Sequence, residues 1–203
     1  MRISEESYYI NGVSKKINDG YFITNWRHAV TILRNDFSEE WEDIIHCLDN
    51  FTLKKSAIKK KGGRKSPIAE ELDSFLYKLG WKEKEFNLDI KVDSKSYDVP
   101  THKLDCVKNK IGLEIEWNNK DPFFDRDLNN FRILYDYGVI DVGVIITRKT
   151  ELQDLFKELG KGSSYGASTT HYNKLKYRIE GNGAGGCPIV VFAISSNLYD
   201  EHS

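Results

Sequence analysis

The spacing of hydrophobic residues is most regular near the middle of the chain, where residues 111–117 alternate between apolar and polar. The apolar members of this alternation are Ile111, Leu113, Ile115 and Trp117. A period of two predicts a β-strand whose apolar side chains enter the core. The same period places Glu114 and Glu116 side by side on the other face of the strand.

Longer apolar spacings on both sides of this strand predict helices. The clearest helix begins at Ser66 and Pro67, a capping residue followed by a proline suited to the first turn, and it ends at Gly80. Ser38 is predicted to cap another helix. The predicted helices cover residues 26–33, 38–48, 66–79, 125–137 and 151–159.

Several apolar runs predict further strands. Residues 139–147 are nearly all β-branched or apolar, which is typical of an interior strand buried on both faces. Residues 188–194 predict a strand that closes the sheet, and residues 81–92 have an extended pattern. Short strands are expected near residues 8–10 and 21–23. A strand, a helix and a buried strand in succession predict a crossover unit, so the expected fold class is α/β with a central mixed sheet flanked by helices.

Two polar segments interrupt these elements. Residues 53–65 are rich in lysine and glycine and predict a mobile basic loop. Such a loop is either a solvated linker or a clamp on a phosphate backbone, which would use Lys59, Lys60 and Lys61. Residues 160–187 predict a second, long polar loop. Loops of that length in a compact domain are often functional.

The whole chain has the size and composition of one folded domain. It has 203 residues, of which 39% are hydrophobic, and its 30 basic and 31 acidic residues nearly balance. Net charge alone therefore predicts no polyanionic partner. A single domain is expected over residues 1–203, with an N-terminal helical part to about residue 65 and a core over about 66–194.

Cysteine usage and apolar runs bear on the location of the protein. The three cysteines are odd in number and lack a metal-ligand spacing, which suggests reduced thiols in the cytoplasm. They are Cys47, Cys106 and Cys187. No apolar run approaches the roughly 20 residues that cross a bilayer, and the N-terminus lacks a signal-peptide core. No contact with a membrane is expected.

Three carboxylates stand close to the central strand. Asp105 precedes Glu114 and Glu116, and the turn-prone residues 108–110 lie between them. A chain reversal there would bring the three acids together, where a cation would offset their repulsion. Hard oxygen ligands suit Mg²⁺ rather than zinc, and Mg²⁺ favours phosphodiester hydrolysis. A solvated strand face and a glycosidase pair are the alternatives, although acids two apart on one strand suit a shared metal better.

The residues around this strand resemble the PD-(D/E)XK nucleases, and more closely the BamHI, BglII and BstYI group of type II restriction endonucleases. Asp105 stands nine positions before Glu114, and Glu116 occupies the place where the group replaces the usual lysine with Glu or Gln. Matching segments extend over roughly residues 66–194: SPIAEELDSFLYKLGWKE, LDCVKNKIGLEIEW, IDVGVIIT and CPIVVFAI. The Pro-Asp dipeptide of the wider signature is absent.

The resemblance implies a restriction-endonuclease-like αβα core and specific roles for the acids. Asp105 and Glu114 would bind Mg²⁺, helped by the main-chain carbonyl of Ile115. Glu116 would orient or deprotonate the attacking water. A further upstream acid often joins such a site, and the possible residues here are Glu83 and Glu85.

The resemblance also implies partners. Such enzymes cut palindromic double-stranded DNA as homodimers, because each protomer then reads the same half-site. Residues 125–137 are expected at the dimer interface, or else they merely cover the sheet. A cognate DNA methyltransferase would share the site without needing to bind. The residues expected to contact DNA in the long polar loop and just after it are Ser164, Thr169, Thr170, His171, Asn173, Lys174 and Arg178.

Two other functions fit the same residues. The chain could be a non-specific or repair-type nuclease of the same fold. It could also be a non-catalytic DNA-binding module whose acids are only surface residues.

Overall fold

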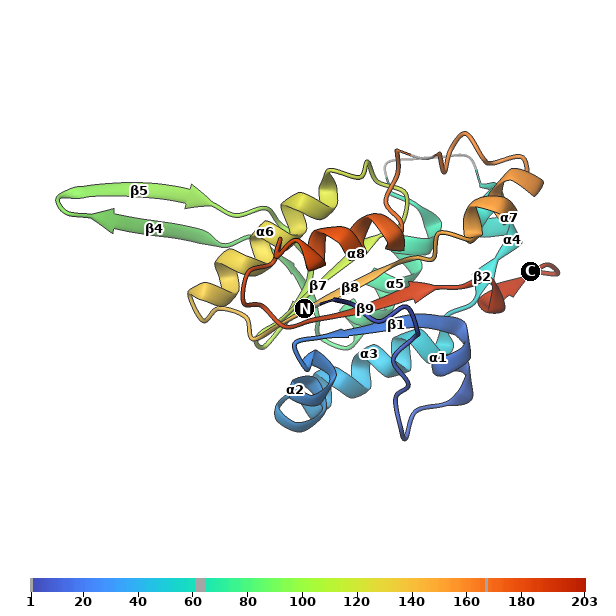
Figure 1. Ribbon diagram of the computed structural model, residues 1–203, viewed down its shortest axis with the longest axis horizontal. Coiled ribbons are helices and arrows are strands. Elements are labelled where there is room, and N and C mark those ends of the chain that lie inside the picture. The colour runs from blue at the N-terminus through green and yellow to red at the C-terminus, as the bar shows by residue number, and fades with distance from the viewer. Residues whose placement is uncertain (1, 61–64, 167) are drawn as a thin grey trace.

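The protein is built around a six-stranded mixed sheet, seen in a computed structural model that describes residues 2–60, 65–166 and 168–203 (Figure 1). The strand order is β1-β9-β8-β7-β6-β3. The central strands β7, β8 and β9 are parallel, while β1, β6 and β3 each run antiparallel to a neighbour. The strands are β1 (Tyr21–Trp26), β3 (Lys82–Lys84), β6 (Leu104–Lys108), β7 (Ile111–Glu116), β8 (Val142–Arg148) and β9 (Ile189–Ile194).

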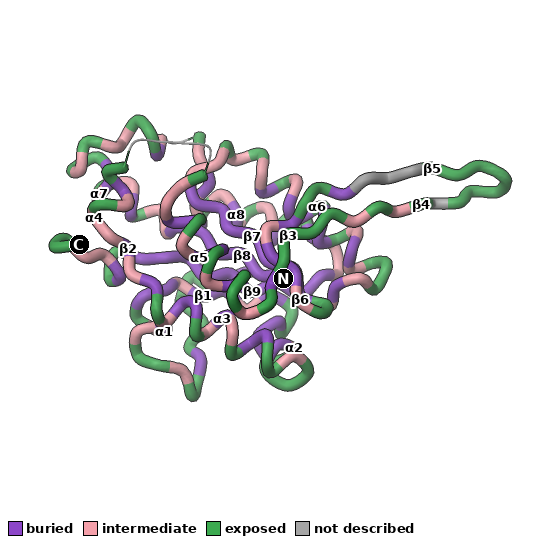
Figure 2. Tube along the Cα trace, turned by 180° about the vertical axis from the view of Figure 1, so that it is seen from behind, coloured by how far each residue is buried: buried purple, intermediate pink, exposed green. Residues whose placement is uncertain are grey.

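Helices cover both faces of this sheet. On one face α6 (Phe123–Asp136) and α8 (Tyr172–Glu180) pack together over an apolar cluster that includes Phe131 and Leu175. The helices on the other face share a second cluster, and they are α2 (Ala29–Asp36), α3 (Ser38–Asn50) and α5 (Pro67–Lys78). The αβα layering and the interior position of β8 are confirmed. In Figure 2 the buried stretches follow the sheet strands and the inner sides of these helices.

The remaining elements are short. They are α1 (Lys15–Gly20), α4 (Lys55–Lys59), α7 (Leu152–Glu158), the 3-10 turn η1 (Ser196–Leu198), and the paired strands β2 (Leu53–Lys54) and β10 (Tyr199–Asp200). In the part of the chain that the structure describes, no helix is both long and apolar enough to cross a bilayer.

Local sequence explains where the best predicted helices begin. Ser66 caps α5 as predicted, since its Oγ accepts a hydrogen bond of 3.1 Å from the amide of Ala69. The prediction that Ser38 caps α3 is wrong by one residue, because Phe37 is the cap and Ser38 is already helical. The first predicted helix starts at Ala29 rather than residue 26, because the left-handed backbone of Arg27 and His28 separates it from β1.

Both predicted polar loops are partly wrong. Residues 53–59 form β2 and α4, because Leu53 and Ile58 are buried and hold this basic stretch against the core. The loop predicted over residues 160–187 contains α8, whose buried side is Tyr172, Leu175 and Ile179. These three residues have helical spacing, but the polar residues between them hide it.

The edges of the sheet also differ from expectation. Residues 8–10 form no strand, although Ile10 is buried and its main chain is hydrogen-bonded to Asn18 at 2.9 and 3.0 Å. The strand at residues 21–23 exists as β1. It pairs with β9, so β9 lies inside the sheet rather than closing it.

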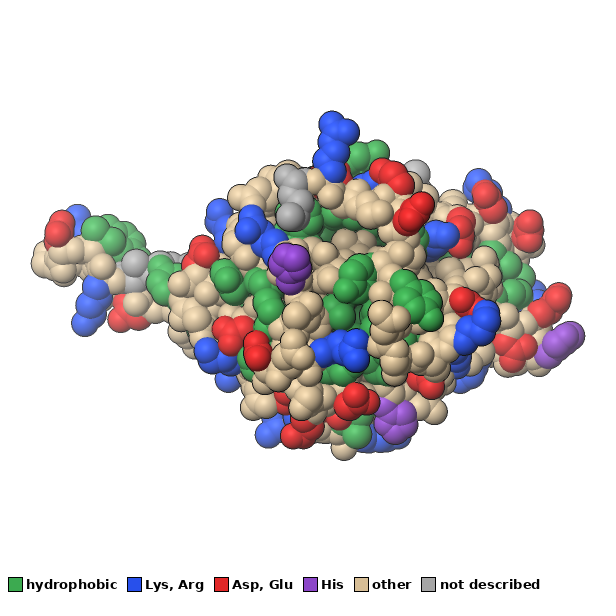
Figure 3. Space-filling model, turned by 60° about the horizontal axis from the view of Figure 1, so that its bottom comes forward, with side chains coloured by type: hydrophobic (Ala, Val, Ile, Leu, Met, Phe, Trp, Pro, Cys, Tyr) green, Lys and Arg blue, Asp and Glu red, His purple; other side chains and the backbone are tan. Residues whose placement is uncertain are grey.

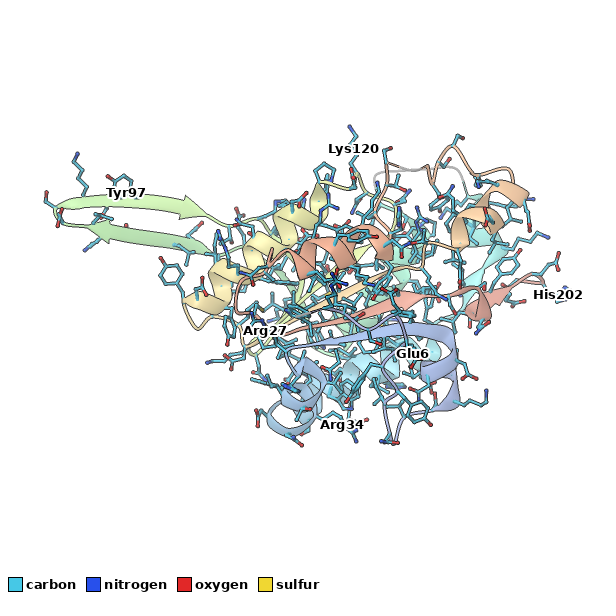
Figure 4. All side chains as sticks on the ribbon, viewed as in Figure 1. Glu6, Arg27, Arg34, Tyr97, Lys120 and His202 are labelled. Atoms are coloured by element: carbon cyan, nitrogen blue, oxygen red, sulfur yellow. The ribbon has the colours of Figure 1, made fainter. Side chains whose placement is uncertain are left out.

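A two-stranded hairpin extends away from the layered body between β3 and β6. Its strands are β4 (Asn87–Val92) and β5 (Lys95–Pro100). Figures 1 and 2 show it as a long exposed arm, and Figure 4 places Tyr97 near its outer end. The extended pattern predicted for residues 81–92 is confirmed, but nothing in that pattern predicts an arm. Its root is held at Phe86, which exchanges hydrogen bonds of 3.0 and 2.8 Å with Thr101 Oγ1.

Charged side chains of both signs are interspersed on the face presented in Figure 3. This mixture agrees with the near balance of 30 basic and 31 acidic residues. The overall charge of that face therefore does not mark it as a surface for a polyanion.

Candidate active site at the divergence of β6 and β7

The candidate site forms where β6 and β7 separate. Their pairing runs from Lys108 and Ile111 to Cys106 and Leu113, and it ends there. The hairpin turn predicted at residues 108–110 is confirmed, with Asn109 in the left-handed region at φ 48°. On its other edge β6 pairs with β3, at Val107 and Leu104, while β7 remains paired with β8 up to its last residue. The acids therefore lie at the mouth of a fork between two strands.

Asp105 and Glu114 are fixed to each other across this fork. Asp105 Oδ2 accepts a hydrogen bond of 2.9 Å from the amide of Ile115, and the amide of Asp105 donates one of 3.3 Å to Glu114 Oε2. Tyr77 of α5 also donates its hydroxyl hydrogen to the carbonyl of Asp105 at 3.1 Å. These hydrogen bonds give the two carboxylates defined positions relative to each other.

Glu114 is a deeply buried acid that lies among other acids. Its side chain is 1% exposed, and Oε1 has no hydrogen-bond partner among the described residues. Burial raises the pKa of Glu114 well above its usual value, and the charges of Asp127, Asp105 and Glu116 raise it further. An oxygen in this position is expensive to bury unless a cation or proton joins it.

Glu116 points to the same side of β7 but contacts different partners. Asn119 Nδ2 donates a hydrogen bond of 3.0 Å to Glu116 Oε2, and Arg126 Nη2 lies 3.6 Å from Oε1. Burial raises the pKa of Glu116, and the carboxyl of Asp127 raises it as well, through its negative charge. Burial also raises the pKa of Asp127, so this pair holds a proton readily. The predicted convergence is thus direct for Asp105 and Glu114, whereas Glu116 acts on Glu114 through its charge.

Two further buried acids complete the surroundings, and sequence reasoning missed both. Asp127 of α6 is fully buried, and Arg126 holds its Oδ1 at 2.8 and 2.9 Å. Asp73 of α5 is 1% exposed, forms an ion pair with Lys65, and accepts a weak hydrogen bond of 3.6 Å from Cys106 Sγ. The sequence did contain a signal, because each acid falls on the apolar face of its helix.

A cleft of about 650 Å³ opens beside Asp105 and Ile115. Its walls come from α4, the start of α5, the segment after β7 and the turn after α7. Of the residues predicted from sequence, Lys60, Glu83 and Ser164 also line it. Glu83 forms an ion pair with Lys103 there, whereas Glu85 is exposed and does not line the cleft.

The residues predicted to contact DNA are not equally accessible. Ser164 and Asn173 are exposed, as are Lys59 and Lys60, while Lys61 lies outside the described residues. Thr170 is fully buried in this conformation.

The other predicted contacts are engaged within the protein. Thr169 Oγ1 accepts a hydrogen bond of 2.8 Å from Arg148, and His171 Nδ1 lies 3.0 Å from Thr150 Oγ1. Lys174 binds Asp121 at 3.0 Å, and Arg178 binds Asp125 through two bonds of 2.8 and 3.1 Å. These side chains would have to exchange partners to reach DNA. Figure 4 shows Lys120, close in sequence to the start of α6, projecting outward.

Comparison with known proteins agrees with this geometry. The family model described as restriction endonuclease BglII/BglIII matches residues 21–194, which is most of the chain. The match extends from β1 to β9 and therefore includes every strand of the main sheet. A search of curated proteins finds no match.

Proposed function

Because this chain belongs to the BglII/BglIII family of restriction endonucleases, we propose that it is a type II enzyme that hydrolyses both strands of a palindromic DNA site with Mg²⁺. Membership of the family makes the protein a nuclease with DNA as its substrate and a divalent metal ion as its usual cofactor. The oxygen donors of the site support Mg²⁺ as the ion, and the two-fold symmetry of a homodimer supports a palindromic target.

The observation that carries the proposal is Oε1 of Glu114, which lies beside Asp105 and has no hydrogen-bond partner within residues 2–60, 65–166 and 168–203. In the described part of the chain, no three acids, histidines or cysteines are already arranged around one metal position. The donor set nevertheless fits a small hard cation, because it consists of carboxylate oxygens with an excess of negative charge. Asp105, Glu114 and the carbonyl of Ile115 would hold the ion. When bound, Mg²⁺ polarises the phosphate and acidifies a bound water.

Glu116 has a separate role in this proposal. Its Oε2 is oriented by Asn119 and its Oε1 lies near Arg126, so the carboxylate has a fixed direction. Arg126 favours the ionised form, whereas the negative charge of Asp127 favours a proton. Glu116 would orient the attacking water and accept its proton, and Asp127 is placed to share that proton.

A homodimer on DNA would deliver one site to each strand of a palindrome. Helix α6 covers the sheet with its apolar side, and Asp125, Asn129 and Arg132 are on its exposed side. That polar side is the proposed dimer surface. Ser164, Thr169, Thr170, His171, Asn173 and Arg178 remain the proposed base-reading set, with Lys59, Lys60, Lys61 and Lys174 at phosphates. A cognate DNA methyltransferase would protect the same site.

A cleavage assay tests the proposal. The purified protein should cut unmethylated plasmid DNA into discrete fragments with Mg²⁺, and EDTA should stop the reaction. Sequencing the fragment ends would then define the site. A smear in place of bands would instead indicate the non-specific nuclease. Intact plasmid across many unmethylated substrates would point to the non-catalytic DNA-binding module.

Neutralising Lys59 and Lys60 together should weaken DNA binding and reduce its dependence on salt. Each phosphate contact contributes about 0.9 to the steepness of a plot of log affinity against log salt concentration. The slope of the double alanine variant should therefore be shallower than that of the wild type by up to about 1.8. Fluorescence anisotropy in Ca²⁺ over a salt series measures this slope. Lys78→Ala with Lys82→Ala removes the same charge from exposed residues outside the basic segment 53–65, and serves as the control. An unchanged slope in the first variant would exclude the clamp.

A further inference from the structure

The site has an unusual distribution of charge. Glu116, the last residue of β7, is an acid whose carboxylate accepts a hydrogen bond from Asn119 and lies 3.6 Å from Arg126 Nη2. Arg126 is on the α6 side and does not line the cleft beside Asp105. Scissile DNA brings further negative charge to this place, so a fixed cation near Asp105 has an obvious electrostatic role.

Three lysines line the cleft in the described part of the chain, namely Lys60, Lys65 and Lys161. They differ in what holds their ammonium groups. Lys161 Nζ donates to the main-chain carbonyl of Lys60 at 3.3 Å. Lys65 Nζ forms an ion pair with Oδ2 of Asp73, an acid that is 1% exposed. Lys65 is therefore anchored by a buried group, unlike an ordinary surface lysine.

The anchor directs Lys65 to the reacting end of the cleft. Lys65 directly precedes Ser66, the cap of α5, and Asp73 lies about two turns further along that helix. Lys65 and Asp105 line the same cleft, and Cys106, the residue after Asp105, donates a hydrogen bond of 3.6 Å to Asp73 Oδ1, so the anchor lies beside the acids of the site. An ammonium has three hydrogens, and the pair with one carboxylate leaves donors for another oxygen. The side chain of Lys65 is also 46% exposed, so DNA can reach it.

We propose that Lys65 is a catalytic residue that supplies, from the start of α5, the cation that the strand lacks at Glu116. This inference rests on the proposed function and adds a residue to it. The ammonium donates a hydrogen bond to a non-bridging oxygen of the scissile phosphate. As the water oxygen bonds to phosphorus and the bond from phosphorus to the leaving sugar oxygen breaks, Lys65 offsets the negative charge that grows on that phosphate. The proton of the water goes to a carboxylate, and Lys65 keeps its own protons. The leaving sugar oxygen keeps the electron pair of the broken bond and takes a proton from solvent water.

Single-turnover cleavage at saturating enzyme tests this role. Lys65→Ala should lower the rate by about 10²-fold or more, as for other groups that stabilise transition-state charge. Its affinity for DNA in Ca²⁺ should change far less than the rate. Lys65→Arg should recover part of the rate, because it keeps the charge in a different shape. Lys157→Ala is the matched control, since Lys157 is also paired with an aspartate, Asp154, but on the exposed surface of α7.

A chemical rescue separates catalysis from folding. Lys65→Cys should be slow, and alkylation with 2-bromoethylamine should restore most of the rate by rebuilding an ammonium of similar length. The natural thiols Cys47, Cys106 and Cys187 are buried, so the new thiol is the reactive one in the folded protein. Because the new ammonium can also restore the ion pair with Asp73, the melting temperature is measured in parallel. A rate that recovers while the melting temperature stays unchanged supports catalysis, and a rate that rises only together with the melting temperature would mean that Lys65 stabilises the fold.

Two results would overturn the proposal while leaving the proposed function intact. One is a wild-type enzyme that cuts DNA and a Lys65→Ala variant that cuts at the same saturated rate. The other is recovery of the rate in Lys65→Ala with Asp73→Asn, which would mean that Lys65 merely neutralises Asp73. If the wild type itself fails to cut in the plasmid assay, the proposed function fails, and the role of Lys65 fails with it.

Discussion

Replacing Glu114 with alanine should reduce DNA cleavage by roughly 10³-fold or more while DNA binding in Ca²⁺ persists. A metal ion contributes several kcal/mol to stabilising charge at a phosphoryl centre, and about 4 kcal/mol corresponds to 10³ in rate. Glu114 is the acid whose Oε1 has no hydrogen-bond partner among the described residues, so the substitution removes the oxygen best placed to bind the ion. Single-turnover cleavage with Mg²⁺ measures the effect.

The control for this variant is Glu42→Ala, which removes an exposed acid from α3 on the surface of the protein. It should cut like the wild type. Binding measured by anisotropy in Ca²⁺ should show that Glu114→Ala still forms a complex with DNA. A variant that bound DNA normally and cut it within about tenfold of the wild-type rate would refute the assignment of Glu114, because a lost metal ligand costs more than 1.4 kcal/mol.

The local features of the fold could be predicted because short-range patterns determine them. The alternation at residues 111–117 predicts β7, and the apolar run at residues 139–147 predicts the buried strand β8. The capping by Ser66 is also local, since it depends on a hydroxyl and an amide three residues apart. The arm formed by β4 and β5 was not predictable in this way, because its strands pair with each other away from the main sheet, and alternation alone does not predict which strands will pair.

Only the part of the candidate site that lies on the hairpin of β6 and β7 was predictable from the sequence. Asp105, Glu114 and Glu116 follow from alternation and from the hairpin, and the structure brings Asp105 and Glu114 into contact. Asp127 and Asp73 come from helices on opposite faces of the sheet, so no spacing along the chain connects them to the strand. Each could be suspected only as an acid on an apolar helix face, where burial without a partner is costly.

A balance between stability and function follows from the same burial. A carboxylate kept from solvent among other acids destabilises the folded state, and proteins retain such groups mainly where function needs them. The fork between β6 and β7 holds Glu114 and Glu116 against α6, which brings Asp127 to them. The metal-free enzyme should therefore be less stable than a variant without the charge of Glu114, and a bound cation should recover part of the lost free energy of unfolding.

Glu114→Gln should accordingly stabilise the metal-free protein by about 1–3 kcal/mol at pH 8. This is the range of free energy that a buried polar group without a hydrogen-bond partner costs the folded state. Glutamine keeps an oxygen that can accept the Asp105 amide and removes the charge. Chemical denaturation with EDTA present measures the difference in the free energy of unfolding. Glu42→Gln, at an exposed position, is the matched control and should leave stability nearly unchanged.

The pH dependence of the free energy of unfolding tests the destabilising effect of Glu114 separately. Burial raises the pKa of Glu114 in the folded state, whereas an unfolded glutamate titrates near about 4.3. Between these values the folded protein binds more protons than the unfolded chain, so this group lowers stability as pH rises, by up to about 1.4 kcal/mol per pH unit. Below the unfolded value both states are protonated and the difference disappears.

Glu114→Gln should flatten that slope of stability against pH, and Ca²⁺ should raise the melting temperature of the wild type much more than that of the variant. An equal rise in both proteins would show that the cation binds elsewhere, because a ligand stabilises a folded protein only through the site that it occupies.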